Sequence, residues 1–180
     1  GDPVQKVSII SRGMMGGFTR ALPTEDRSLE SRKKLISDMV GLLGGRAAEE
    51  IMFNDITSGA SSDIEQVTKL ARSMVTRLGM SDKLGPMVYG QKEELIFLGR
   101  EISEQRDYSE AVAQEIDREV QRAVSEAYQS AKAILETYKD KLIAVAEKLL
   151  EVETITKEEF EAIFPPPVEK NQGIPVIFPA

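Results

Sequence analysis

Residues 57–75, TSGASSDIEQVTKLARSMV, predict the start of an amphipathic helix. Ser62 and Glu65 match the S-x-x-E capping box, in which the serine hydroxyl and the glutamate carboxylate each bond a free backbone N–H group. Gly79 stands where a helix C-terminal cap is favoured. Between these signals the apolar residues recur at three- and four-residue steps: Ile64, Val67, Leu70, Ala71, Met74, Val75 and Leu78. We therefore expect one helix that follows the serine cluster and ends near Gly79.

Asp63 lies in the first turn of this predicted helix and has two readings. An acidic side chain there interacts favourably with the helix dipole, by about 0.3 to 1 kcal/mol when exposed, and needs no further role. Alternatively, its carboxylate is a metal ligand on a rigid helix start, where Ser61 and Ser62 fix the backbone. Spacing alone does not separate the two readings.

The segments around this helix favour a mainly α fold with one or two small β-hairpins. Residues 4–21 carry β-type residues around a glycine-rich turn, which predicts a hairpin, and the runs 87–89 and 95–98 flank a polar turn and predict a second. A helical pattern extends from about residue 28 to 51. Within it, Gly41, Gly44 and Gly45 indicate either a helix break or the close approach of another backbone.

The C-terminal half predicts long helices followed by a tail. Apolar residues recur at helical steps from Ser109 to about residue 150, and the pattern continues or restarts near Lys139. Two antiparallel helices packed along these stripes would form a C-terminal helical hairpin. Thr156 and Glu159 form a second capping box before a short helix. Residues 165–180 hold five of the eight prolines, so we expect a domain over residues 1–164 and a proline-rich C-terminal tail over 165–180.

The composition argues against several classes of function. A net charge of -7 disfavours binding to nucleic acid. The chain has no Cys and no His, so thiolate and imidazole metal ligands and a Ser-His-Asp triad are excluded. No G-x-x-x-x-G-K-[ST] loop or G-x-G-x-x-G turn is present, so the chain is not expected to bind nucleotide by itself. No complete catalytic apparatus is visible in the sequence.

Seven motifs occur in a characteristic order between about Pro3 and Arg100: PVQKVSIISRG, GGFT, LPTED, LLGGRAAEE, TSGASSDIEQVTKLARSMV, LGMSDKLGPMVYG and IFLGRE. Their order and spacing resemble the peptidase domain of the FtsH-type ATP-dependent zinc metalloproteases, membrane-anchored AAA+ proteases of bacteria, mitochondria and chloroplasts. The resemblance implies that Asp63 corresponds to the family's third zinc ligand and that zinc is the cofactor of the complete domain. It also implies unfolded membrane and cytosolic proteins as substrates, an upstream AAA+ module and a homo-hexamer. The membrane anchor would lie upstream, with this domain on the cytoplasmic side or in an organelle's stroma or matrix.

The sequence departs from the family in one respect. The HExxH motif, which supplies two zinc-binding imidazoles and the glutamate that acts as general base, is absent. The resemblance implies that it lies shortly before Gly1, so we expect an N-terminally truncated peptidase domain with no catalytic residue in this chain. A lone carboxylate is one of the three protein ligands that a catalytic zinc requires, so we predict neither tight zinc binding nor peptidase activity for this chain alone. The alternative function is a catalytically inert assembly module.

The resemblance also suggests minor roles, each with a structural alternative. The segment Val4 to Thr19 resembles a strand region to which an extended substrate could add as a strand, or it is a simple structural hairpin. Arg46 is expected to form a structural ion pair with Glu49 or Glu50. The run 32–34, Arg-Lys-Lys, is expected to be a solvated helix face.

Overall fold

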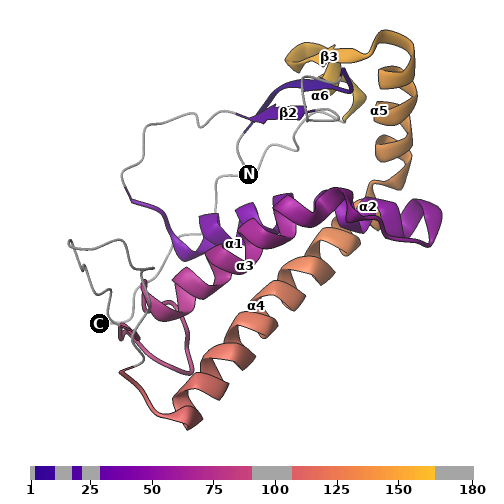
Figure 1. Cartoon of the computed structure of the whole chain (residues 1–180). Coiled ribbons are helices and arrows are strands. Elements are labelled where there is room, and N and C mark those ends of the chain that lie inside the picture. Colours follow the sequence, from indigo (N-terminus) through magenta and orange to yellow (C-terminus); the bar gives the residue numbers. More distant parts are fainter. Residues whose placement is uncertain (1–2, 11–17, 22–28, 91–106, 165–180) are drawn as a thin grey trace, which may run out of the picture. The chain divides into compact units, whose positions relative to one another are not determined.

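The computed structural model describes residues 3–10, 18–21, 29–90 and 107–164 (Figure 1). These residues fall into two compact units, the first from residues 24–139 and the second from residues 2–23 and 140–180. The predicted mainly α fold with a small β-hairpin is confirmed, because helices dominate and the strands form one small antiparallel sheet. The C-terminal helical hairpin stays a prediction. None of the helices in the described ranges has the length and apolar character needed to cross a bilayer.

The first unit consists of three helices that each contact a fourth, longer one. These are α1 (Arg32–Leu42), α2 (Gly44–Phe53), α3 (Ser61–Thr76) and α4 (Glu110–Thr137), with a short 3-10 helix, η1 (Ser58–Ala60), directly before α3. Helices α1, α2 and α3 all pack against α4 (Figure 1). The buried core comes from the apolar stripes of all four helices: Leu35, Met39, Leu43, Ala47, Val67, Ala71, Met74, Val75, Ile116, Val120, Ala127 and Ala131.

The second unit contains a three-stranded antiparallel sheet. Its order is β2-β1-β3, formed by β2 (Phe18–Ala21), β1 (Val4–Ser8) and β3 (Thr154–Thr156). The predicted N-terminal hairpin is therefore confirmed, with Val7 opposite Thr19 on one side and opposite Ile155 on the other. The third strand was not predicted, since three residues are too few to display an alternating pattern.

Two helices flank β3 in the sequence. Helix α5 (Lys139–Val152) comes before it, and α6 (Lys157–Ile163) follows it. The predicted capping box of α6 is confirmed: the Thr156 N–H donates to Glu159 at 2.9 Å, and the Glu159 N–H donates to the Thr156 hydroxyl at 3.4 Å. The helical pattern that begins at Ser109 does restart at Lys139, and α5 belongs to the second unit from Asp140 onward.

The structure decides between the two readings of the glycine-rich segment. The predicted helix divides at Leu43 into α1 and α2, so the helix break is confirmed. Within the described part of the chain the close-approach reading is wrong, because a Cβ added at Gly41, Gly44 or Gly45 would meet no described atom within 4 Å. The second predicted hairpin is not formed as proposed: residues 87–89 are not in a strand, and residues 95–98 lie outside the described residues.

Gly79 reverses the chain after α3, although the helix itself ends at Thr76 and Arg77 is its C-cap. The glycine has a φ of +59°, in the left-handed region that side chains disfavour. An added Cβ would lie 2.8 Å from the Pro86 Cα, because the following loop folds back against it. Both the backbone angle and the space therefore require glycine.

We expect Gly79→Ala to lower the free energy of unfolding by about 2 kcal/mol or more. The left-handed backbone alone costs an alanine roughly 1 to 2 kcal/mol, and the contact with Pro86 adds to that. Gly41→Ala is the matched control, since Gly41 is helical and an added Cβ would meet no atom of the described residues within 4 Å, and this change should raise the free energy of unfolding by about 0.5 to 1 kcal/mol. Urea unfolding followed by circular dichroism measures both. Two changes of the same sign would contradict this account.

Candidate functional site

Asp63 lies in the first turn of α3 and is half-buried. Among the described residues its carboxylate makes no hydrogen bond or ion pair. The same residues contain no group of three His, Cys, Asp or Glu side chains that could hold a metal ion. Asp63 thus has the chemistry of one zinc ligand, but the described residues do not make up a zinc site, and its metal role stays a prediction.

The predicted capping box at the start of α3 is wrong. The helix begins at Ser61 with Ala60 at the N-cap, and Ala60 makes no side-chain cap bond. The Thr57 hydroxyl instead accepts the Gly59 N–H at 3.1 Å and caps η1, which leads straight into α3. Ser62 is therefore already inside the helix, and Glu65 pairs with Lys69 one turn later at 2.5 Å.

Glu49 of α2 holds the turn that comes before Asp63. The Thr57 N–H donates to Oε2 of Glu49 and the Thr57 hydroxyl donates to Oε1, both at 2.9 Å. The backbone bond, and then the hydroxyl bond, lowers the pKa of the Glu49 carboxyl. Because both bonds favour the charged form, Glu49 is a carboxylate acceptor that ties α2 to the start of η1.

Glu50, the next residue, faces α4 instead. Its Oε1 accepts the Lys132 ammonium at 2.7 Å, and its Oε2 accepts the Tyr128 hydroxyl. The bonds from Lys132 and then Tyr128 lower the pKa of Glu50. The predicted pairing with Arg46 is wrong, since within the described ranges Arg46 exerts only a longer-range Coulombic attraction on the two glutamates.

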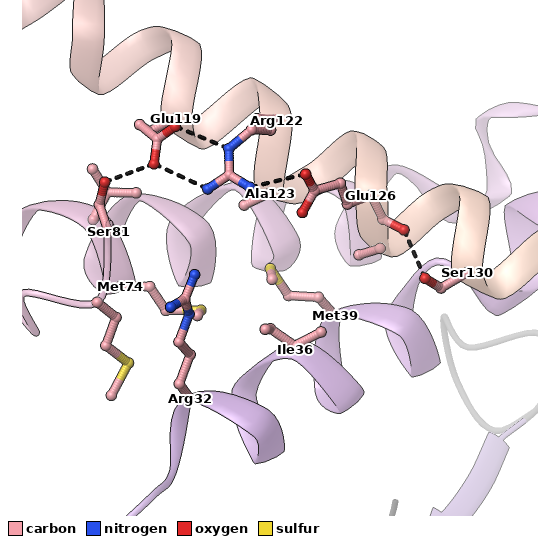
Figure 2. Close-up of a pocket in the computed structure, with 13 residues that line it drawn as sticks. Arg32, Ile36, Met39, Met74, Ser81, Glu119, Arg122, Ala123, Glu126 and Ser130 are labelled. Carbon is pink, nitrogen blue, oxygen red and sulfur yellow. Dashed lines mark hydrogen bonds and ion pairs between the residues drawn. The ribbon is translucent and has the colours of Figure 1, made fainter. Parts of the chain in front are cut away.

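A second group of charged side chains surrounds a cavity of about 160 Å³ between α1, α3 and α4 (Figure 2). Glu119 lines this cavity, is only 3 % exposed and accepts the Ser81 hydroxyl at 2.6 Å. Arg122 donates to the same carboxylate through Nε at 2.9 Å and Nη2 at 3.0 Å, and to Glu126 through Nη1 at 2.8 Å. The rest of the lining is mostly apolar and includes Ile36, Met39, Met74, Met80, Ala123 and Ala127.

This cluster is built for structure rather than for proton transfer. The bonds from Arg122, and then from Ser81, lower the pKa of Glu119 even though burial opposes the change. A general base works best with a pKa near the working pH, so a carboxylate with a lowered pKa is poorly suited to that role. Sequence reasoning missed Glu119; the available signal was an acidic residue on the apolar face of α4, between Ile116 and Val120.

The basic run at the start of α1 makes ion pairs at the surface. Arg32 donates both Nη atoms to the carboxylate of Asp82, at 2.8 and 2.9 Å, across the loop that follows α3. Lys34 pairs with Asp38 one turn along α1 at 2.5 Å. The Arg32 side chain is 41% exposed and its partner Asp82 is 75% exposed, so this surface ion pair is consistent with the predicted solvated helix face.

Comparison with known proteins identifies related sequences. The profile of peptidase family M41 matches residues 1–163. The ATP-dependent zinc metalloprotease FtsH 1 of Thermomicrobium roseum is 51% identical over 181 residues, which cover 99% of this chain and 28% of that protein. The ATP-dependent zinc metalloprotease FtsH of Thermotoga maritima is 48% identical over 171 residues, 94% of this chain and again 28% of the relative. The chain thus spans less than a third of the length of these relatives.

Glu119→Gln should lower the free energy of unfolding by about 2 kcal/mol at pH 7, because it leaves Arg122 without its buried charged partner. The pKa of Glu119 is lower in the folded chain than in the unfolded one, so its charge stabilises the fold above the ordinary glutamate value of about 4.3. That contribution is lost as the pH falls through the lowered folded pKa. The difference between wild type and variant in urea unfolding should therefore shrink at acid pH.

Glu126→Gln is the matched control for this experiment, since Glu126 binds the same arginine but its side chain is 64% exposed. We expect it to change the free energy of unfolding by about 0.5 kcal/mol or less. Equal effects of the two substitutions, or a Glu119→Gln effect that does not change with pH, would refute the structural role of the buried carboxylate.

Proposed function

The chain belongs to peptidase family M41, and from this we propose that it is the greater part of the peptidase domain of an FtsH-type ATP-dependent zinc metalloprotease. The match over residues 1–163 is the observation that carries the proposal. We assign the domain to residues 1–164 and treat residues 165–180 as a proline-rich tail. In the complete protein this domain would hydrolyse peptide bonds of unfolded membrane and cytosolic proteins.

Asp63 is the residue of this chain that we propose as a zinc ligand. In support, its carboxylate is open among the described residues and lies on the first turn of a well-packed helix. The other two ligands and the general base would come from an HExxH segment upstream. When bound, zinc supplies a Lewis acid that polarises the scissile carbonyl and activates water. What this chain provides is a carboxylate held at a defined place.

We further propose that the sheet of the second unit receives extended substrate by strand addition. Strand β1 pairs with β2 on one side and β3 on the other, so neither of its edges can take another strand. An added strand would therefore have to pair with β2 or β3. Because β2 includes residues of the GGFT motif, we assign the addition to β2.

The whole protein is proposed to be a membrane-anchored homo-hexamer in which an AAA+ module feeds substrate to the peptidase domains. The names of the relatives, ATP-dependent zinc metalloproteases, support an ATPase module and zinc. This domain would lie on the cytoplasmic side of the membrane or in the stroma or matrix of an organelle.

A catalytically inert assembly module is the second candidate function. Both candidates are compatible with the finding that the described residues contain no group of three His, Cys, Asp or Glu side chains able to hold a metal ion. The coding sequence upstream of Gly1 separates the two: an in-frame HExxH within about 30 codons, the short reach of a zincin helix motif, supports the protease. A start codon without such a motif supports the inert module.

We expect the chain alone, purified and dialysed against zinc-containing buffer, to hold far less than one zinc per chain. A single carboxylate lacks the imidazole partners that give zinc sites their affinity. Atomic absorption measures the metal, and digestion of an unfolded protein measures the activity, which should be absent. A zinc content near one per chain, or measurable cleavage, would contradict the prediction.

In the full-length protein, Asp63→Ala should remove bound zinc and lower peptidase activity by about 100-fold or more. Substitution of a residue that only hydrogen-bonds to a metal ligand typically lowers activity by about 10- to 100-fold, so loss of a ligand should exceed that range. Asp117→Ala is the control, because this aspartate is exposed on α4 and, among the described residues, its one ion pair is a 3.5 Å contact with Arg72. Zinc content and peptidase activity are measured for both. Full zinc occupancy in Asp63→Ala would show that Asp63 is not a ligand.

A further inference from the structure

The turn before Asp63 depends on one carboxylate from another helix. Glu49 of α2 accepts two hydrogen bonds from the same residue, one from the Thr57 N–H and one from the Thr57 hydroxyl, both at 2.9 Å. The Thr57 oxygen in turn accepts the Gly59 N–H at 3.1 Å. These three bonds form a continuous link, which we call the Glu49 latch, from α2 to the 3-10 helix η1.

The latch replaces the cap that α3 lacks. Ala60, the N-cap of α3, makes no side-chain cap bond, so in the described part of the chain the start of α3 relies on the turn before it. The turn is also tightly fitted: a Cβ added at Gly59 would lie 3.2 Å from the Thr57 hydroxyl and 3.7 Å from Oε1 of Glu49. Ala60 itself is buried, at 6% exposed. The latch therefore joins helix α2 to η1, which leads directly into the first turn of α3.

Asp63 has no such support of its own. Its carboxylate makes no hydrogen bond to another described residue, so its location depends on where the backbone of the first turn of α3 lies. A ligand must be held to within a fraction of an ångström to bind a metal well, which requires its supporting residues to be fixed. Glu49 is the side chain that supplies this support from outside the turn.

We propose that Glu49 is a positioning residue for Asp63, acting through Thr57 to fix the start of α3. The proposal rests on the proposed function of Asp63 as a zinc ligand. Glu49 does not itself bind the metal, because both of its oxygens face Thr57. It differs in this from Glu50, which lies beside it on α2 but binds α4 through Lys132 and Tyr128.

The first test measures hydrogen exchange of this chain by NMR, at the N–H groups of Thr57 and Gly59. Glu49→Ala should speed their exchange by about tenfold or more, since it removes a charged acceptor of two bonds. Glu50→Ala is the matched control, because it removes a paired carboxylate of the same helix without touching the turn. Equal exchange rates at these two positions in both variants would overturn the latch.

The second test uses the full-length protein and its affinity for zinc, together with the visible absorption of the cobalt-substituted form. Glu49→Ala and Thr57→Val should each weaken zinc binding by about tenfold or more and alter the cobalt spectrum. Thr57→Ser keeps the hydroxyl, so zinc affinity and the cobalt spectrum should stay close to those of the wild type. If Thr57→Val acted only through a general loss of stability, the hydroxyl would not make this difference. Glu50→Ala should leave both unchanged.

The zinc measurements distinguish the ligand role of Asp63 from the positioning role of Glu49. If Asp63→Ala retains zinc, the proposed function of Asp63 is wrong. If Asp63→Ala loses zinc but Glu49→Ala and Thr57→Val bind it as tightly as Glu50→Ala does, Asp63 remains a ligand and the positioning role of Glu49 is wrong. Fast exchange in Glu49→Ala with unchanged zinc affinity would likewise overturn the positioning role.

Discussion

Burial of apolar side chains against α4 is the interaction on which the first unit depends. Helices α1, α2 and α3 contain 11, 10 and 16 residues, lengths at which isolated helices are marginal in water. Each of them packs against the 28-residue α4, and fully buried residues such as Met39, Val67 and Ile116 contribute about 1.5 to 3 kcal/mol each. Secondary and tertiary structure in this unit therefore form together.

Two carboxylates add positional control to this apolar packing, one at each end of α3. Glu49 of α2 binds Thr57 just before the helix, and Glu119 of α4 binds Ser81 in the loop just after it. Burying a charge such as Glu119 is costly unless it is paired, and the two bonds from Arg122 offset that cost. Apolar contacts alone would tolerate small shifts of α3 along its neighbours, whereas these directional bonds tie the segments that come before and after it to α2 and α4.

The sequence predicted the helices well, because their period follows from local geometry, and it predicted capping unevenly. The same S/T-x-x-E pattern is right at Thr156, where the chain leaves β3 in an extended conformation with φ of -75° and ψ of 171°. It is wrong at Ser62, because Thr57 had already started a turn five residues earlier along the chain. A four-residue motif carries no information about the conformation of the chain that enters it.

The partners of the charged side chains were the least predictable part, since they are distant in the sequence. Glu119 and Ser81 are 38 positions apart, and Glu50 and Lys132 are 82 apart. Asp63 was reached only through the resemblance, since a helix-dipole role accounts equally well for an acidic residue in a first turn. Glu49, Glu50 and Glu119 all accept hydrogen bonds from neighbouring side chains, whereas Asp63 makes no hydrogen bond or ion pair to another described residue. An acidic side chain that only interacts with the helix dipole need not be held in one position, whereas a metal ligand must be.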